Sequence, residues 1–212
     1  LKFLKNNNQY DIVGTSMTTI SESGDIIGKA KCFQDVDILK KIIKYSLPMA
    51  HIWMARRVVY KDLNGYREIV GCEDDDFILR ADSLSFNYTN IEDDYSYYVR
   101  LGRGSNSNDL LGLRKIKMRK YVYKLHLERG KCNAQDSFSA SSLERSIQSG
   151  RILSYLHSKS NIFLYKAIQY KGSNFFLLSG IYLALSCISI YQIQYLYERI
   201  MIRLIGNRLF SK

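Results

Sequence analysis

The sequence predicts an α+β protein, with a β-rich N-terminal domain and flanking helices, followed by a single C-terminal transmembrane helix. Three observations lead to this prediction. The first 150 of the 212 residues are enough to bury a hydrophobic core. Turn signals and alternating apolar residues between positions 52 and 127 are typical of strands. The uncharged stretch at 172–197 is long enough, as a helix, to cross a bilayer.

Charge is divided unevenly along the chain. Residues 1–150 contain 23 Lys/Arg and 19 Asp/Glu, whereas residues 151–212 contain 8 Lys/Arg and one acid, Glu198. Positive charge beside an apolar helix is typical of attachment to anionic lipid head groups. We therefore expect four segments: a folded α+β domain at 1–150, a juxtamembrane helical segment at 151–171, the transmembrane helix at 172–197 and a basic tail at 198–212.

The first expected elements are a short strand at 26–32 and a helix after it. Asp35 is a suitable helix N-cap, and Val36, Leu39 and Ile42 then recur on one helical face. Pro48 is expected to end this helix or to kink the chain after it.

The middle of the chain predicts strands. Residues 58–60 and 67–70 flank the pair Asn64-Gly65, whose tolerance of positive φ predicts a β-hairpin. Further strands are expected at 77–80, 84–88, 95–101 and 114–128. In the last of these, a change of alternating phase near Arg119 predicts a β-bulge or a twist.

The last part of the chain predicts helices. Ser141 and Glu144 have the spacing of a capping box, and Gly150 is expected to end the helix that they begin. Scattered apolar residues at 151–170 predict a segment that lies on the membrane surface or packs beneath the domain. Beyond the anchor, a helical apolar pattern continues with three arginines about one turn apart: Arg199, Arg203 and Arg208.

Small residues near the centre of the uncharged run predict a helix contact within the membrane. Gly180 and Ala184 are one turn apart, and Cys187 lies near the same face. Such residues let a second helix approach closely, although ordinary lipid-facing composition is an alternative. A buried core helix is the alternative for the whole run, but such helices usually contain only about 10–14 apolar residues.

A basic stretch at 114–131 is the second candidate surface. Six of its cations are candidate contacts for an anionic partner: Arg114, Lys115, Lys117, Arg119, Lys120 and Lys124. Tyr121 and Tyr123 lie among them, and interleaved cations and rings are typical of nucleic-acid-binding surfaces. In the alternative interpretation, these cations pair with the nine acidic residues at 68–94, within the protein or between subunits.

No motif indicates catalysis, a cofactor or a metal site. The four cysteines form no CxxC pair and the three histidines are scattered, so the ligand spacing of a zinc site is missing. The acidic run at 73–76 lacks the spacing of an EF-hand and is expected to be a solvated loop. The glycine-rich residues at 102–108 lack a P-loop ending and are expected to form an ordinary loop. The sole tryptophan, Trp53, is expected to be a core or interface anchor.

Together these patterns predict a non-catalytic, single-pass membrane-anchored accessory subunit of a large organellar complex. Phe, Tyr, Met, Ile, Asn and Lys make up 83 residues against 36 for Gly, Ala, Arg and Pro, a bias typical of AT-rich genomes such as those of organelles. The expected partners are other protein subunits and a bilayer with anionic head groups. The expected location is the mitochondrial inner membrane, in a respiratory or ATP-synthase-type complex. The alternative is a ribosome- or nucleic-acid-associated protein that uses residues 114–131.

Overall fold

The computed structural model describes residues 1–49, 53–100, 112–132 and 135–207. Over these residues the chain is an α+β protein, as predicted, with two three-stranded sheets. The strands are β1 (Ile12–Thr15), β2 (Met17–Ile20), β3 (Ile26–Ala30), β4 (Trp53–Ala55), β5 (Tyr88–Ile91) and β6 (Tyr97–Arg100). The helices are α1 (Lys2–Asn6), α2 (Val36–Ile42), α3 (Arg57–Asp62), α4 (Glu73–Ser83), α5 (Leu113–Arg129), α6 (Ala140–Ile147), α7 (Arg151–Gly172), α8 (Phe176–Ser186) and α9 (Ile190–Asn207).

The chain passes directly from one sheet to the other at two places, from β1 to β2 and from β5 to β6. β1 pairs with β4 antiparallel and with β5 parallel, and β2 pairs with β3 antiparallel and with β6 parallel. Only Ser16 separates β1 from β2. Its buried hydroxyl donates to the carbonyl of Glu92 and accepts from the N–H of Cys32 at 3.1 Å, so the junction is fixed by hydrogen bonds from two other segments.

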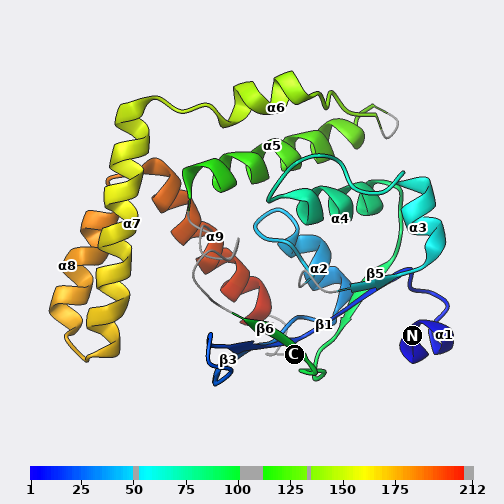
Figure 1. Cartoon of the computed structure of the whole chain (residues 1–212), viewed down its shortest axis with the longest axis horizontal. Coiled ribbons are helices and arrows are strands. Elements are labelled where there is room, and N and C mark those ends of the chain that lie inside the picture. Colours follow the sequence, from blue (N-terminus) through cyan, green and yellow to red (C-terminus); the bar gives the residue numbers. More distant parts are fainter. Residues whose placement is uncertain (50–52, 101–111, 133–134, 208–212) are drawn as a thin grey trace.

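The hydrophobic core lies between the β1 sheet and helices α2, α4 and α5. Parallel pairing of β1 with β5 requires a long crossover connection, which the chain between these strands provides with α2, α3 and α4. Ile12, Leu39, Phe77, Val122 and Leu125 are fully buried there. In Figure 1, α2, α4, α5 and α6 are layered above the strands, while α7 and α8 form an arm at one side.

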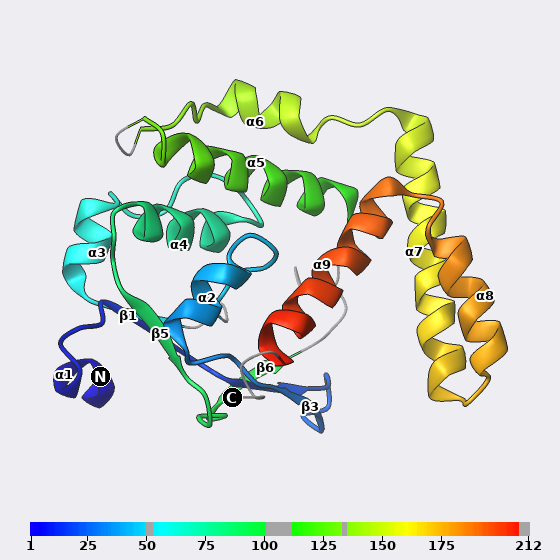
Figure 2. The same cartoon turned by 180° about the vertical axis from the view of Figure 1, so that it is seen from behind.

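The last three helices leave the body and return to it. α7 and α8 are neighbouring helices joined by a turn in which Asn174 has a φ of +63°. α9 then runs back toward the sheets and packs beside α2 (Figure 2). Near its end Gly206 is buried against Phe33, and a Cβ at Gly206 would lie 2.8 Å from that ring. Residues 198–207, expected to be a basic tail, therefore belong to a packed helix.

The prediction of one helix over 172–197 is wrong. The structure divides this run among the turn after α7, the 11-residue helix α8 and the first part of α9. Polar contacts hold the break after α8: Ser160 Oγ donates to the carbonyl of Ser186, and His157 Nδ1 lies 2.9 Å from Ser189 Oγ. Within the described ranges, no helix combines the length and hydropathy needed to cross a membrane.

The predicted strand at 114–128 is also wrong, because this stretch forms α5. Its buried residues recur at intervals of three and four, the helical spacing: Met118, Tyr121, Val122, Leu125 and Arg129. The alternation that suggested a strand included Leu127, which is 49% exposed. The expected β-bulge near Arg119 is therefore absent from the structure at that position.

Three other predictions fail in the middle of the chain: the hairpin at 58–70 and the strands at 77–80 and 84–88. The expected hairpin at 58–70 is α3 followed by a turn, in which Asn64 and Gly65 do have positive φ, of 52° and 70°. The strand expected at 77–80 is instead part of α4, where all four of these residues are buried. Of the strand expected at 84–88, only Tyr88 is in a strand, β5.

Several local predictions are confirmed. β3 lies within the strand predicted at 26–32, and β6 lies within the strand predicted at 95–101. The carboxylate of Asp35 caps α2 by accepting from the N–H of Ile38 at 2.9 Å. A capping box begins α6, but it is formed by Ser139 and Ser142, two residues before the predicted pair.

Candidate functional site

A cleft of about 200 Å³ lies between the end of α2, helix α5 and helix α9. We call it the cationic cleft. Its charged lining consists of Lys44, Lys115, Arg119, Lys120 and Arg199, together with the acids Asp75 and Glu198. Three tyrosines also line it: Tyr45, Tyr123 and Tyr195. The fold thus brings three of the six predicted anion-contact residues together with cations from two distant segments.

The other three predicted contact residues lie elsewhere. Arg114 lines a separate hollow beside Phe138 and α6. Lys117 Nζ donates to the carbonyl of Gln148. Lys124 lies 3.6 Å from Glu128 on the same helix. The six cations therefore do not form one continuous binding surface.

Three cations of the cleft contact neighbouring side chains. Arg119 Nη1 lies 2.9 Å from a carboxylate oxygen of Asp75. Arg199 Nε donates to the hydroxyl of Tyr195 at 3.1 Å. Lys120 Nζ lies 4.3 Å from the centre of the Tyr191 ring, within the range of a cation–π contact.

Burial affects the electrostatics of Lys120. Desolvation lowers the pKa of its ammonium, although the nearby carboxylate of Glu198 acts in the opposite direction. In the described part of the chain, no carboxylate oxygen lies within 4.0 Å of Lys120 Nζ, the distance of an ion pair. An added anion beside Lys120 would favour its charged form.

The acidic run at 73–76 is the first turn of α4, so the prediction of a solvated loop is wrong. Asp75 and Asp76 are buried, and Asp76 lies 2.7 Å from Nε of Arg80. Acidic side chains at this end of a helix are stabilised by its dipole. The pairing of Asp75 with Arg119 also means that one predicted anion contact is partly neutralised within the chain.

A second buried ion-pair group joins α5 to the segment before α6. Asp136 accepts from Arg67 Nη1 at 2.9 Å and also pairs with Arg129. Burial alone would raise the pKa of Asp136, but the hydrogen bonds from both arginines outweigh it, and the pKa lies below its usual range. The folded state therefore favours the charged carboxylate.

We expect this carboxylate to make stability depend on acid pH. Because the folded-state pKa of Asp136 is depressed, its contribution is complete above about pH 4, the unfolded-state pKa. The contribution is lost as pH falls through the lower folded-state pKa. Urea unfolding of the wild type and Asp136→Asn should therefore differ most near neutral pH, and the difference should shrink below about pH 4. A constant difference across this range would contradict the assignment.

The described residues contain no group of three or more His, Cys, Asp or Glu placed to hold a metal ion. His157 and Ser189 are in contact, but both are buried, so this pair is enclosed in the junction of α7, α8 and α9. The predicted glycine-rich loop at 102–108 lies outside the described residues.

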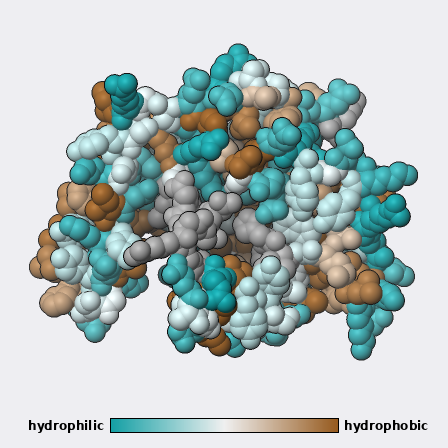
Figure 3. Space-filling view, viewed as in Figure 1, coloured by the Kyte–Doolittle hydropathy of each residue, from teal (hydrophilic) through white to brown (hydrophobic). Residues whose placement is uncertain are grey.

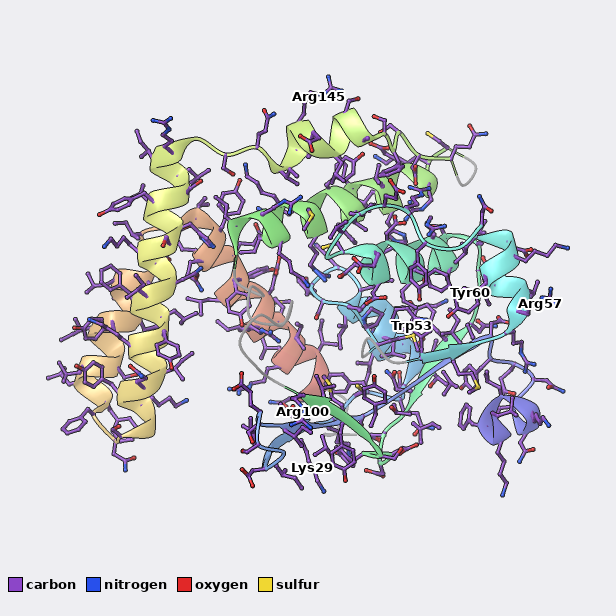
Figure 4. All side chains as sticks on the ribbon, in the orientation of Figure 1. Lys29, Trp53, Arg57, Tyr60, Arg100 and Arg145 are labelled. Atoms are coloured by element: carbon purple, nitrogen blue, oxygen red, sulfur yellow. The ribbon has the colours of Figure 1, made fainter. Side chains whose placement is uncertain are left out.

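Aromatic rings form a cluster around Phe77 of the core. Trp53 stacks on Phe77 with ring centres 5.9 Å apart, and Tyr60 and Tyr66 lie 5.0 and 4.7 Å from it. Figure 4 labels Trp53 and Tyr60 near the end of the molecule where β4 leads into α3. Trp53 thus packs against the core as an anchor, and this cluster is explained by packing.

The α7–α8 hairpin exposes many apolar side chains, most of them on α8. α8 contains no charged residue, and Phe176 and Leu177 at its start are 66% and 80% exposed. Other exposed apolar residues continue along α8: Leu178, Ile181, Leu183 and Leu185. Figure 3 shows apolar side chains on the surface that this arm contributes.

Of the predicted helix-packing residues, Gly180 and Ala184 lie on the outer side of α8, and Cys187 directly follows its last residue. Gly180, Ala184 and Cys187 are exposed, and a Cβ at Gly180 would meet open space. α8 contacts α7 through other residues, including Tyr182, whose ring stacks on Tyr170 with centres 5.3 Å apart. The three small residues are therefore accessible to a helix from a partner.

No protein-family model, curated protein or solved structure matches this chain. The arguments about function therefore depend on the geometry of the cationic cleft and the hairpin.

Proposed function

We propose that this chain is a non-catalytic accessory subunit of a larger organellar membrane assembly, and that the α7–α8 hairpin attaches it to the membrane. The observation that carries the proposal is the apolar surface of α8, which the body of the protein leaves exposed. Exposed apolar patches larger than a few hundred Å² are uncommon on monomers and mark interaction sites.

Energy favours an apolar environment around α8. Burying one Leu, Ile or Phe side chain contributes about 1.5–3 kcal/mol. Five exposed residues of this type lie within two turns of the helix: Phe176, Leu177, Leu178, Ile181 and Leu183. They are distributed around α8 rather than along one stripe, so an environment that surrounds the helix suits them better than a flat protein surface.

Length and charge suggest how the hairpin meets a bilayer. The 11 residues of α8 extend about 16 Å at about 1.5 Å per residue, roughly half of a 30 Å hydrocarbon layer. α7 and α8 carry Arg151, Lys159, Lys166 and Lys171 but no acidic residue. Basic residues beside an apolar helix bind anionic head groups. The hairpin therefore suits insertion into one leaflet.

The other parts of the proposal have different support. Ser83, His126 and Asp82 lie close together, with Ser83 Oγ 3.1 Å from His126 Nδ1 and His126 Nε2 3.7 Å from a carboxylate oxygen of Asp82. The hydroxyl of Ser83 donates to the carbonyl of Leu79 at 2.8 Å and accepts from Nε of Arg129 at 2.9 Å, so its hydrogen bonds are used within the fold, which favours a structural role.

The residue composition favours an AT-rich organellar origin, and with it the mitochondrial inner membrane. We infer that the protein belongs to an assembly because the small residues Gly180, Ala184 and Cys187 face outward. Such residues let the helix of a neighbouring subunit approach closely.

The nucleic-acid alternative has weaker support. It requires the cations of α5 to face one nucleic-acid strand together. However, Arg119 is paired with Asp75, and Lys117 donates to the carbonyl of Gln148. Arg114 lies in a different hollow from Lys120. A surface built for a phosphate backbone would present these charges along one face.

Vesicle flotation tests the membrane attachment. We expect the wild-type chain to float with vesicles of phosphatidylcholine and phosphatidylglycerol, and less with phosphatidylcholine alone. The variant Phe176→Glu/Ile181→Glu/Leu185→Glu should partition at least about tenfold less, because it removes three side chains that each contribute about 1.5–3 kcal/mol.

The matched control changes three apolar residues on the body that are exposed to a similar degree. Ile26→Glu/Ile27→Glu/Val70→Glu should float like the wild type, since these residues lie on β3 and in the loop before α4. Equal loss in both triple variants, or no flotation of the wild type, would contradict the proposal.

A further inference from the structure

The cationic cleft has a charge that its own residues do not balance. Its lining holds five cations and two carboxylates, a net charge of about +3. One carboxylate, Asp75, is engaged by Arg119 at 2.9 Å. The other, Glu198, accepts from Gln194 Nε2 at 2.7 Å. Neither carboxylate lies within 4.0 Å of the charged nitrogens of Lys44, Lys115 or Arg199.

Two of the five cations, Arg119 and Arg199, contact neighbouring groups before any ligand arrives. Arg119 Nη2 also donates to the carbonyl of Ile43 at 3.3 Å, so both of its Nη groups are engaged within the protein and Arg119 adds positive charge to the wall of the cleft. Tyr195 fixes Arg199 through Nε and leaves the Nη groups available. Preorganised donors reduce the entropy lost on binding and so increase affinity.

We propose that the cationic cleft binds a phosphate or pyrophosphate group of a small ligand. Arg199 presents a planar guanidinium group whose Nη donors match a pair of phosphate oxygens, and Lys44, Lys115 and Lys120 supply point charges. The volume of about 200 Å³ exceeds that of a single phosphate and is below the range of about 300–1,000 Å³ typical of drug-sized ligands. A phosphoryl group at the end of a larger molecule therefore fits, with the rest of that molecule in solvent.

This site is independent of the membrane attachment proposed above. It lies between α2, α5 and α9, whereas the apolar surface belongs to α8. Binding to the cleft is measured without anionic lipid, and flotation is measured without phosphate ligands. Either proposal can thus fail while the other holds.

Isothermal titration of the full chain in dodecyl maltoside, a neutral detergent, tests the cleft. Inorganic pyrophosphate is the first probe and short-chain phosphatidic acid is the second, because the same phosphate chemistry occurs free and on lipids. Lys120→Met and Arg199→Met should each weaken the binding by about tenfold or more, as expected for a lost charge-assisted hydrogen bond.

Two control variants make the result specific. Lys124→Met and Arg203→Met remove a cation about one turn further along α5 and α9, outside the cleft lining. Both should bind like the wild type. Binding of either probe with this pattern supports the site. The probe that binds shows whether the phosphate group is free or part of a lipid. Absence of binding to both probes, equal loss in all four variants, or binding of only long RNA that pyrophosphate does not displace would overturn the proposal.

Discussion

Replacing Asp76 with alanine should lower the free energy of unfolding by about 3–5 kcal/mol, the cost of breaking a buried ion pair. The side chain of Asp76 is fully buried, and its carboxylate lies 2.7 Å from Nε of Arg80. Removal would leave the buried guanidinium of Arg80 without its countercharge. Arg80 also donates to the carbonyls of Leu63 and Gly65, so it cannot turn outward without leaving those acceptors unpaired.

The matched control is an ion pair on the surface. Asp93 lies 3.7 Å from Lys31, and the side chain of Asp93 is 86% exposed. Asp93→Ala should therefore change the free energy of unfolding by less than about 1 kcal/mol. Urea unfolding of both variants checks the contrast, and equal effects would show that the Asp76 pair is not buried as described.

A double variant distinguishes the cost of an unpaired buried charge from the cost of losing the hydrogen bonds that Arg80 donates. Asp76→Leu/Arg80→Met should recover part of the stability lost in Asp76→Ala, because it removes both buried charges together. Recovery should be incomplete, since the carbonyls of Leu63 and Gly65 lose their donor.

The second large effect is expected at Gly14 in β1. A Cβ at this position would lie 2.3 Å from Oδ1 of Asn90, a distance that no side chain tolerates. Asn90 Nδ2 donates to the carbonyls of Phe33 and Pro48, at 2.8 and 3.1 Å, so displacing Asn90 breaks both contacts. Gly14→Ala should destabilise the protein by about 1–3 kcal/mol from overpacking alone, with the lost hydrogen bonds adding to this.

Gly28 provides the control for the strand environment. It lies in β3, and a Cβ there would meet no atom within 4 Å. Gly28→Ala should be neutral or slightly stabilising, because it reduces the entropy of the unfolded chain. If thermal unfolding showed the same loss of stability for both alanine variants, the contact between Gly14 and Asn90 would be wrong.

Local signals in the sequence were sufficient for some elements. Asp35 predicted the start of α2 because an N-cap acts over three residues and needs no tertiary partner. The positive φ of Asn64 and Gly65 was predicted correctly, but the turn follows a helix and does not join two strands. Turn chemistry fixes the backbone at the turn without specifying the flanking elements.

The errors share a physical origin in tertiary packing. In α5, alternate residues from Tyr121 to Leu127 fit a strand pattern, while Met118, Tyr121, Val122 and Leu125 fit a helical one. Burial against α4 decides between these patterns. The break between α8 and α9 depends on contacts of Ser186 and Ser189 with α7, so the uncharged run alone could not show it.

The cationic cleft could be predicted only in part. Lys115, Arg119 and Lys120 were identified from their charge density along the chain. Lys44 and Arg199 join them only because α9 packs beside α2, a contact between segments about 150 residues apart. No local pattern specifies that contact.

The most direct test of membrane attachment by α8 is the fluorescence of an NBD group on a single cysteine. The label is placed by Leu177→Cys in a chain whose accessible cysteines, Cys32, Cys132 and Cys187, are replaced by serine. A label at Ser23→Cys, in the turn after β2, is the control. Anionic vesicles should shift the emission at position 177 to shorter wavelengths and leave position 23 unchanged. No shift at position 177, or an equal shift at both positions, would contradict insertion of the hairpin.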